Sequence, residues 1–172
     1  LVLYRLVYPK SKLKTTEYLY RYSQKNYSED EIYRYLDKLQ DSQKELVQQI
    51  SFEHTKALFK DNINVVFYDV TTVYFEIDDE DELRKTGFSK EGKHQNPQIV
   101  LGLLVSKHGY PLAYDIFEGN KFEGHTMLPV ITTFTEKYNL KQPVIVADSG
   151  LLSNKNIEIL LLNAYLENEE GN

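Results

Sequence analysis

Hydrophobic and polar positions recur with two different periods along this chain of 172 residues, first as in helices and then as in strands. From about residue 29 to residue 60, apolar side chains recur every three or four positions, as on one face of a helix. Ser28 precedes this segment and Glu31 follows three residues later, which is the sequence signature of a capping box. We predict a helix over 29–60, with a break near Asp41 and Ser42 left open. Residues 1–8 allow either a strand or a helix.

The middle of the chain changes to β-prone segments at 65–75, 99–105 and 112–117. The turn at 107–111 separates the last two segments and predicts a hairpin. A helix over 125–138, a strand after Pro143 and a last helix capped by Ser153 complete the order β-β-β-α-β-α. This order predicts an α+β fold with a mixed sheet, in which the fourth strand lies parallel to the first. The last helix is apolar on almost all sides, which predicts a buried helix.

Two of the apolar strand segments each lead into one aspartate. Val65–Tyr68 precede Asp69, and Val144–Ala147 precede Asp148. A carboxylate at the end of a buried strand is costly unless a positive charge meets it there. If the fold brings both aspartates together, they can hold Mg²⁺ or Mn²⁺ and support phosphoryl transfer. The alternative remains open that each aspartate only accepts hydrogen bonds from the backbone of the turn after its strand.

Other kinds of site are excluded or disfavoured by the sequence. The chain has no cysteine, so thiolate metal sites and disulfides are absent. Its four histidines, His54, His94, His108 and His125, include no pair at metal-ligand spacing, and we interpret each as structural or exposed. Glycine-rich phosphate loops and a nucleophile elbow are missing. The acidic run at 78–82 lacks the alternating ligands of a calcium loop and predicts a solvated loop.

The charge is uneven along the chain. The net charge of −6 argues mildly against a simple nucleic-acid binder. Lys and Arg nevertheless outnumber the acids in residues 1–60, where they are interleaved with tyrosines. Two interpretations stay open for this part: a helical region that contacts DNA through phosphates and stacked bases, or an amphipathic helix pair with solvated charges.

Three segments carry a resemblance to a known family: YDVTTVYFE at 68–76, LRKTGFSKEGKHQNPQIVLGLLVSKHGYPLAYDIFEGNKFEGHTMLPVI at 83–131, and VIVADSGLLSNKNI at 144–157. Together they resemble the DDE transposases of bacterial insertion sequences, in the group whose third carboxylate lies in a Tyr-Arg-Glu-Lys signature. The resemblance implies a ribonuclease-H-like core that cuts and joins DNA strands with Mg²⁺ or Mn²⁺. It makes Asp69 and Asp148 the first and second catalytic carboxylates and metal ligands. The implied partner is DNA at insertion-sequence ends, in the bacterial cytoplasm at the nucleoid, without a membrane; a homo-oligomer stays open.

The resemblance also divides the chain and shows departures from the family. It implies a helical region over 1–60, a partial ribonuclease-H-like domain over 61–166 and a polar tail over 167–172. Ser149 stands where the family usually has a basic residue after the second aspartate. Glu158 comes too early to match the third carboxylate, and the tail acids Glu167, Glu169 and Glu170 lack the signature around them. We therefore expect a C-terminally truncated, inactive fragment.

Two other functions stay open. The chain could be a non-catalytic DNA- or protein-binding remnant of a transposase, or another ribonuclease-H-like nuclease whose third acid is Asp115 or Glu118. Under the truncation hypothesis, we also expect an exposed sheet edge and an apolar patch at 160–162, with low solubility or self-association.

Overall fold

The computed structural model describes residues 1–60, 63–88, 92, 95–140 and 143–170, with the side chains of 40, 41 and 163–170 left out. The chain forms two compact units, Leu1–Gln49 and Ile50–Asn172, and each is described by itself. Within the described residues there are six helices and one four-stranded sheet, so the predicted α+β class is confirmed. The predicted domain boundary at residue 60 stays a prediction.

The first unit is helical. It contains α1 (Val2–Val7), α2 (Lys12–Ser23) and most of α3 (Glu29–Phe59). Residues 1–8 are therefore a helix and not a strand. Their C-terminal residue, Tyr8, stacks on Tyr22 of α2 with ring centroids 6.0 Å apart and contacts Tyr18 at 5.2 Å. These ring contacts join α1 to α2.

The start of α3 has the predicted capping box. The Ser28 backbone N–H donates to the Glu31 carboxylate at 2.8 Å, and the Glu31 N–H donates to Ser28 Oγ at 3.2 Å. The break considered near Asp41 and Ser42 does not occur, because α3 is one helix from Glu29 to Phe59. The Ser42 hydroxyl donates to the Lys38 carbonyl one helical turn earlier, at 3.0 Å, as serine side chains do within helices.

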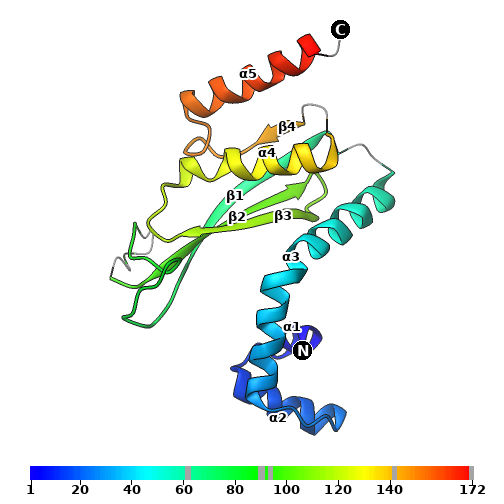
Figure 1. Ribbon diagram of the computed structural model, residues 1–172, viewed down its shortest axis with the longest axis vertical. Coiled ribbons are helices and arrows are strands. Elements are labelled where there is room, and N and C mark those ends of the chain that lie inside the picture. Colours follow the sequence, from blue (N-terminus) through cyan, green and yellow to red (C-terminus); the bar gives the residue numbers. More distant parts are fainter. Residues whose placement is uncertain (61–62, 89–91, 93–94, 141–142, 171–172) are drawn as a thin grey trace. The chain divides into compact units, whose positions relative to one another are not determined.

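The second unit is built on a mixed, open sheet (Figure 1). Its strands lie in the order β3-β2-β1-β4, with β4 parallel to β1 and the other pairs antiparallel. The predicted hairpin and the predicted parallel fourth strand are thus both present. The elements are β1 (Val65–Tyr74), β2 (Gln98–Ser106), β3 (Pro111–Glu118), η1 (Glu123–His125), α4 (Met127–Tyr138), β4 (Val144–Val146) and α5 (Asn154–Glu170).

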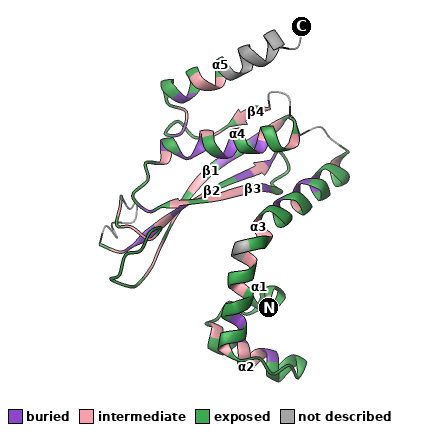
Figure 2. Ribbon diagram, in the orientation of Figure 1, coloured by how far each residue is buried: buried purple, intermediate pink, exposed green. Residues whose placement is uncertain are grey.

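One face of the sheet is buried beneath α4. Alternate residues of β1 point to this face, and Val66 and Tyr68 are 0% and 2% exposed. They share a core with Leu104 of β2 and with Met127 and other apolar residues of α4. Figure 2 shows buried residues concentrated on α4 and the strands it covers. The end of α3 joins this core through Phe52, whose ring stacks on Tyr138 at 3.8 Å.

The opposite face of the sheet stays partly exposed in the described part of the unit. Phe67, Leu103, Ile116 and Val146 are 38–40% exposed, and each comes from a different strand. Apolar residues of α5 are also exposed: Leu161 and Leu162 are 66% and 58% exposed, although Leu160 packs against the core. The prediction of a buried last helix is therefore wrong for Leu161 and Leu162, because only one side of α5 has a surface to pack against.

Gly102 of β2 leaves room for the Tyr68 side chain. Gly102 pairs with Val70 of β1, and the Tyr68 ring packs over it on the buried face. A Cβ added at Gly102 would overlap the Tyr68 hydroxyl and lie 2.9 Å from Tyr68 Cζ. The buried ring cannot move away easily, because interiors are packed as densely as organic crystals.

We predict that Gly102→Ala lowers the free energy of unfolding by about 1–3 kcal/mol, because the added methyl overpacks the core. Urea denaturation followed by circular dichroism measures this change. In a Tyr68→Phe background the same substitution should cost less, because the closest atom has been removed. A cost within about 0.5 kcal/mol of zero in the unmodified chain would contradict this packing.

Burial raises the pKa of the Tyr68 hydroxyl from 10.0 to about 12. The nearby Thr126 hydroxyl offsets part of this rise, but its own proton goes to the Glu123 carbonyl at 2.6 Å. The unfolded chain therefore loses the Tyr68 proton near pH 10, whereas the folded chain retains it to about pH 12. Stability from this group is complete below pH 10 and is lost as pH rises toward 12.

We predict that denaturation midpoints in urea fall between pH 10 and pH 12, and that Tyr68→Phe makes this fall less steep. Comparing the two proteins isolates Tyr68 from the other groups that titrate in this range. Equal pH dependence in both proteins would mean that the Tyr68 hydroxyl does not titrate differently in the folded state.

Candidate functional site

Asp69 lies in the middle of β1 and not at the end of a strand. The strand runs from Val65 to Tyr74, with the exposed positions Phe67, Asp69, Thr71 and Val73 alternating with more buried ones. The predicted strand end at Asp69 is therefore wrong. The β-branched residues after Asp69 continue the strand. The Asp69 carboxylate reaches solvent from the open face of the sheet, so it does not have to lie at the end of a strand. Asp69 pairs with Leu103 of β2 on the same face.

Asp148 lies two residues beyond β4. Val146, the last residue of β4, pairs with Phe67 of β1 in the parallel register. Asp69 and Asp148 thus each lie two residues beyond this last pair, Asp69 within β1 and Asp148 at the turn that follows β4. Both carboxylates are exposed. The parallel pairing therefore places two aspartates that are far apart in the sequence beyond the same end of the β1–β4 ladder.

Each aspartate also makes a local hydrogen bond. One carboxylate oxygen of Asp69 accepts from the Val70 backbone N–H at 2.8 Å. The Asp148 carboxylate accepts from the Leu151 N–H at 3.2 Å, and the Asp148 carbonyl accepts from both Leu151 and Leu152. Asp148 thus stabilises the turn after β4, as the alternative interpretation expected. Among the described residues, no recorded hydrogen bond occupies the other oxygen of either carboxylate.

The donor set suits one hard, hydrated cation. Mg²⁺ is commonly held by one or two carboxylates and keeps several water ligands, so the exposed carboxylates of Asp69 and Asp148 are ligands of the kind it binds. In the part of the chain that the structure describes, no group of three or more His, Cys, Asp or Glu side chains could hold a metal. The two aspartates would therefore supply at most two protein ligands, fewer than a two-metal centre needs.

Neither Asp115 nor Glu118 completes the site. Asp115 pairs with Gly102, one position from the partner of Asp69, so it lies on the opposite face of the sheet. Glu118 pairs with Ile99, which in turn pairs with Val73. It is thus four residues, about 13 Å, along the sheet from Asp69 and two strands away. Neither acid can share a cation with Asp69 in this sheet.

The other acids considered do not join the site either. Glu158 is exposed on α5 and belongs to no metal-binding group of described residues. The side chains of Glu167, Glu169 and Glu170 lie outside the described residues.

The acidic run at 78–82 forms a loop held by its own hydrogen bonds. Asp81 accepts from the Arg84 and Leu83 N–H groups at 2.6 and 2.9 Å, and the Arg84 side chain contacts it at 2.6 Å. These bonds, first that from the Arg84 backbone, lower the pKa of the Asp81 carboxyl. Glu80 accepts from the Thr86 hydroxyl and backbone, which lowers its pKa. The carboxylates of Glu80 and Asp81 thus accept hydrogen bonds from residues of the same loop. The acidic run is exposed to solvent, as predicted.

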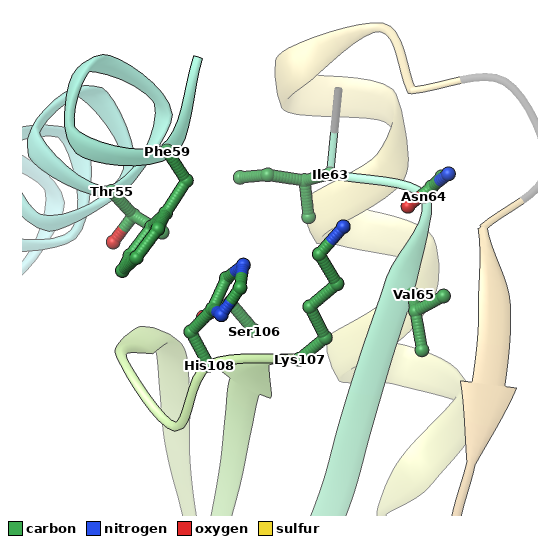
Figure 3. Close-up of a pocket in the computed structure, with 8 residues that line it drawn as sticks. All are labelled: Thr55, Phe59, Ile63, Asn64, Val65, Ser106, Lys107 and His108. Carbon is green, nitrogen blue, oxygen red and sulfur yellow. The ribbon is translucent and has the colours of Figure 1, made fainter. Parts of the chain in front are cut away.

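The histidines pack against aromatic rings. His108 stacks on Phe59 with ring centroids 3.9 Å apart, and His125 lies edge-on to Phe122 at 5.3 Å. His108 and Phe59 line a small cavity with Lys107 and others (Figure 3). Its volume of about 10 Å³ holds about one water molecule, too little for a substrate. These ring contacts agree with the prediction that the histidines are structural or exposed. His94 lies outside the described residues.

Comparison with known proteins adds no identity. No family model, no curated protein and no solved structure matches this chain. Among the helices of the described residues, none combines the length and the apolar character needed to cross a membrane.

Proposed function

We propose that this chain carries part of a divalent-metal site for DNA strand cleavage and transfer of the DDE transposase type. The observation that carries the proposal is the parallel β1–β4 pairing, because Asp69 and Asp148 each follow its last pair, Phe67 and Val146, by two residues. A mixed sheet with this strand order also supports the proposed ribonuclease-H-like assignment. The same two aspartates follow the apolar strand segments of the sequence and match the first two carboxylates in the family resemblance.

The roles of the two aspartates follow from their exposure and position. Asp69 is held within β1, where it pairs with Leu103 of β2 two residues beyond the β1–β4 pairing. Asp148 is held by the turn in which its own carboxylate accepts from Leu151. When bound, a divalent cation would supply charge stabilisation for a phosphodiester and activate a nucleophile. The two carboxylates hold and orient that cation on the open face.

Two carboxylates are too few to fix two metal ions around a scissile phosphate. A third protein ligand would come from residues beyond those described or from another chain. A non-catalytic DNA- or protein-binding role is the second candidate, because the described residues contain no group of three acids or histidines. The third candidate, a nuclease that uses Asp115 or Glu118, has no support from the sheet register.

We predict that Mn²⁺ stabilises the folded chain and that Asp69→Asn abolishes this effect. At a Mn²⁺ concentration ten times its dissociation constant, the gain is about 1.4 kcal/mol. For a chain of this size, such a gain raises the melting temperature by a few degrees. Thermal unfolding with and without millimolar Mn²⁺ measures the shift.

Glu118→Gln is the matched control for this experiment, because Glu118 is an exposed acid on the same sheet but distant from Asp69. It should keep the full response to Mn²⁺. A melting temperature that Mn²⁺ leaves unchanged in the unmodified chain would exclude the metal site. An equal loss of response in Glu118→Gln would place the cation elsewhere.

We predict that the purified chain does not nick plasmid DNA at a measurable rate in Mn²⁺, because its described residues offer only two metal ligands together. Agarose gel electrophoresis of supercoiled plasmid measures nicking, with Asp148→Ala as the control for contaminating nucleases. Strong nicking by the unmodified chain and none by Asp148→Ala would mean that the chain supplies its own third ligand. The proposal of an incomplete site would then be wrong.

A further inference from the structure

The first unit has a cavity of about 630 Å³ between the end of α2 and the first turns of α3. Its volume falls in the range of small-molecule sites. Every residue that lines it belongs to Leu1–Gln49, and none belongs to the aspartate site. The cavity is therefore a feature of the first unit by itself.

The lining of the cavity combines aliphatic and aromatic side chains. Its aliphatic members are Leu1, Leu19 and Ile32, of which Leu19 and Ile32 are 7% and 4% exposed. Tyr27 and Tyr35 also line it and remain 43% and 41% exposed. Two tyrosines beside aliphatic side chains offer ring faces on which a flat aromatic ring can stack.

The rim of the cavity is positively charged. Lys25, Arg34 and Lys38 line it, and none has an ion-pair partner within 4.0 Å among the described residues. The one acid that lines it is Glu31, whose carboxylate accepts hydrogen bonds from Ser28 in the capping box. Arg34 and Lys38 are four residues apart on one helix, where like charges repel. A bound anion would relieve this repulsion.

A ligand that suits this cavity has a flat aromatic part and an attached anionic group. An unpaired nucleotide has both: a base that stacks on tyrosine and a phosphate that pairs with Lys and Arg. A base within a duplex is already stacked on its neighbours and cannot enter the cavity without leaving the stack.

We propose that this cavity binds one unpaired nucleotide, with the base against Tyr27 and Tyr35 and the phosphate at Lys25, Arg34 and Lys38. The nucleotide belongs either to a single strand or to a free nucleoside monophosphate. This site goes beyond the proposed metal chemistry and does not depend on it, since its ligands are tyrosines and cations.

Fluorescence anisotropy of the full chain with a labelled short oligothymidylate tests the proposal. Tyr27→Ala and Arg34→Gln should each weaken binding about tenfold or more, the loss expected for one stacked base or one charged contact. Tyr20→Ala is the matched control, because Tyr20 is an exposed tyrosine of α2 that does not line the cavity. It should bind as the unmodified chain does. Circular dichroism of each variant verifies that the helices are retained.

Competitors identify the source of the nucleotide. Displacement by thymidine monophosphate indicates a free-nucleotide site, whereas displacement only by unlabelled oligothymidylate indicates a single-strand site. Binding should weaken with salt with a log–log slope of about −0.7, as expected for one neutralised phosphate on a single strand. It should persist in EDTA and in Asp69→Asn, which separates this test from that of the metal site.

Three results would overturn the proposal. They are no binding of the oligothymidylate, equal weakening by Tyr20→Ala and Tyr27→Ala, and displacement by blunt duplex DNA as effective as that by the single strand. The first two would show that the cavity is not the binding site, and the third would show that it does not select unpaired bases.

Discussion

The second unit depends on β1, which pairs with strands of both orientations. It pairs antiparallel with β2 and parallel with β4, so its alternation of side chains decides what each face of the sheet presents. Val66 and Tyr68 point to the face beneath α4, and Phe67 and Asp69 point to the open face. A shift of one residue in the register would bury the Asp69 carboxylate and expose the Tyr68 ring, at high cost in both places.

This constraint also explains the composition of the candidate site. The core needs Tyr68 over Gly102, and the strict alternation then leaves Asp69 in solvent beside Leu103. The short parallel pairing with β4 brings Asp148 to the neighbouring strand. An exposed carboxylate pair costs little in stability when each accepts a backbone hydrogen bond, as both do here. The fold can therefore carry the pair without destabilising its own core.

The two units offer different chemistry. Asp69 and Asp148 belong to the second unit, whereas the cavity of the first unit combines tyrosines with lysine and arginine. The uneven distribution of charge along the sequence already indicated this difference. Only the structure separated Tyr27 and Tyr35, which line the cavity, from Tyr8, Tyr18 and Tyr22, which pack on one another.

The sequence by itself determined the helices and strands, because their signals are local. Side chains a few residues apart predict the capping box at Ser28, the hairpin of β2 and β3, and the order β-β-β-α-β-α. Because crossover connections are right-handed, this order then favours a β4 parallel to β1. The tertiary structure alone decided that Asp69 lies within a strand, that Asp115 and Glu118 lie away from it, and that Leu161 and Leu162 are exposed. These outcomes depend on which face of an element meets another element. Such contacts join residues that are distant in sequence, so the local periodicity of the sequence cannot predict them.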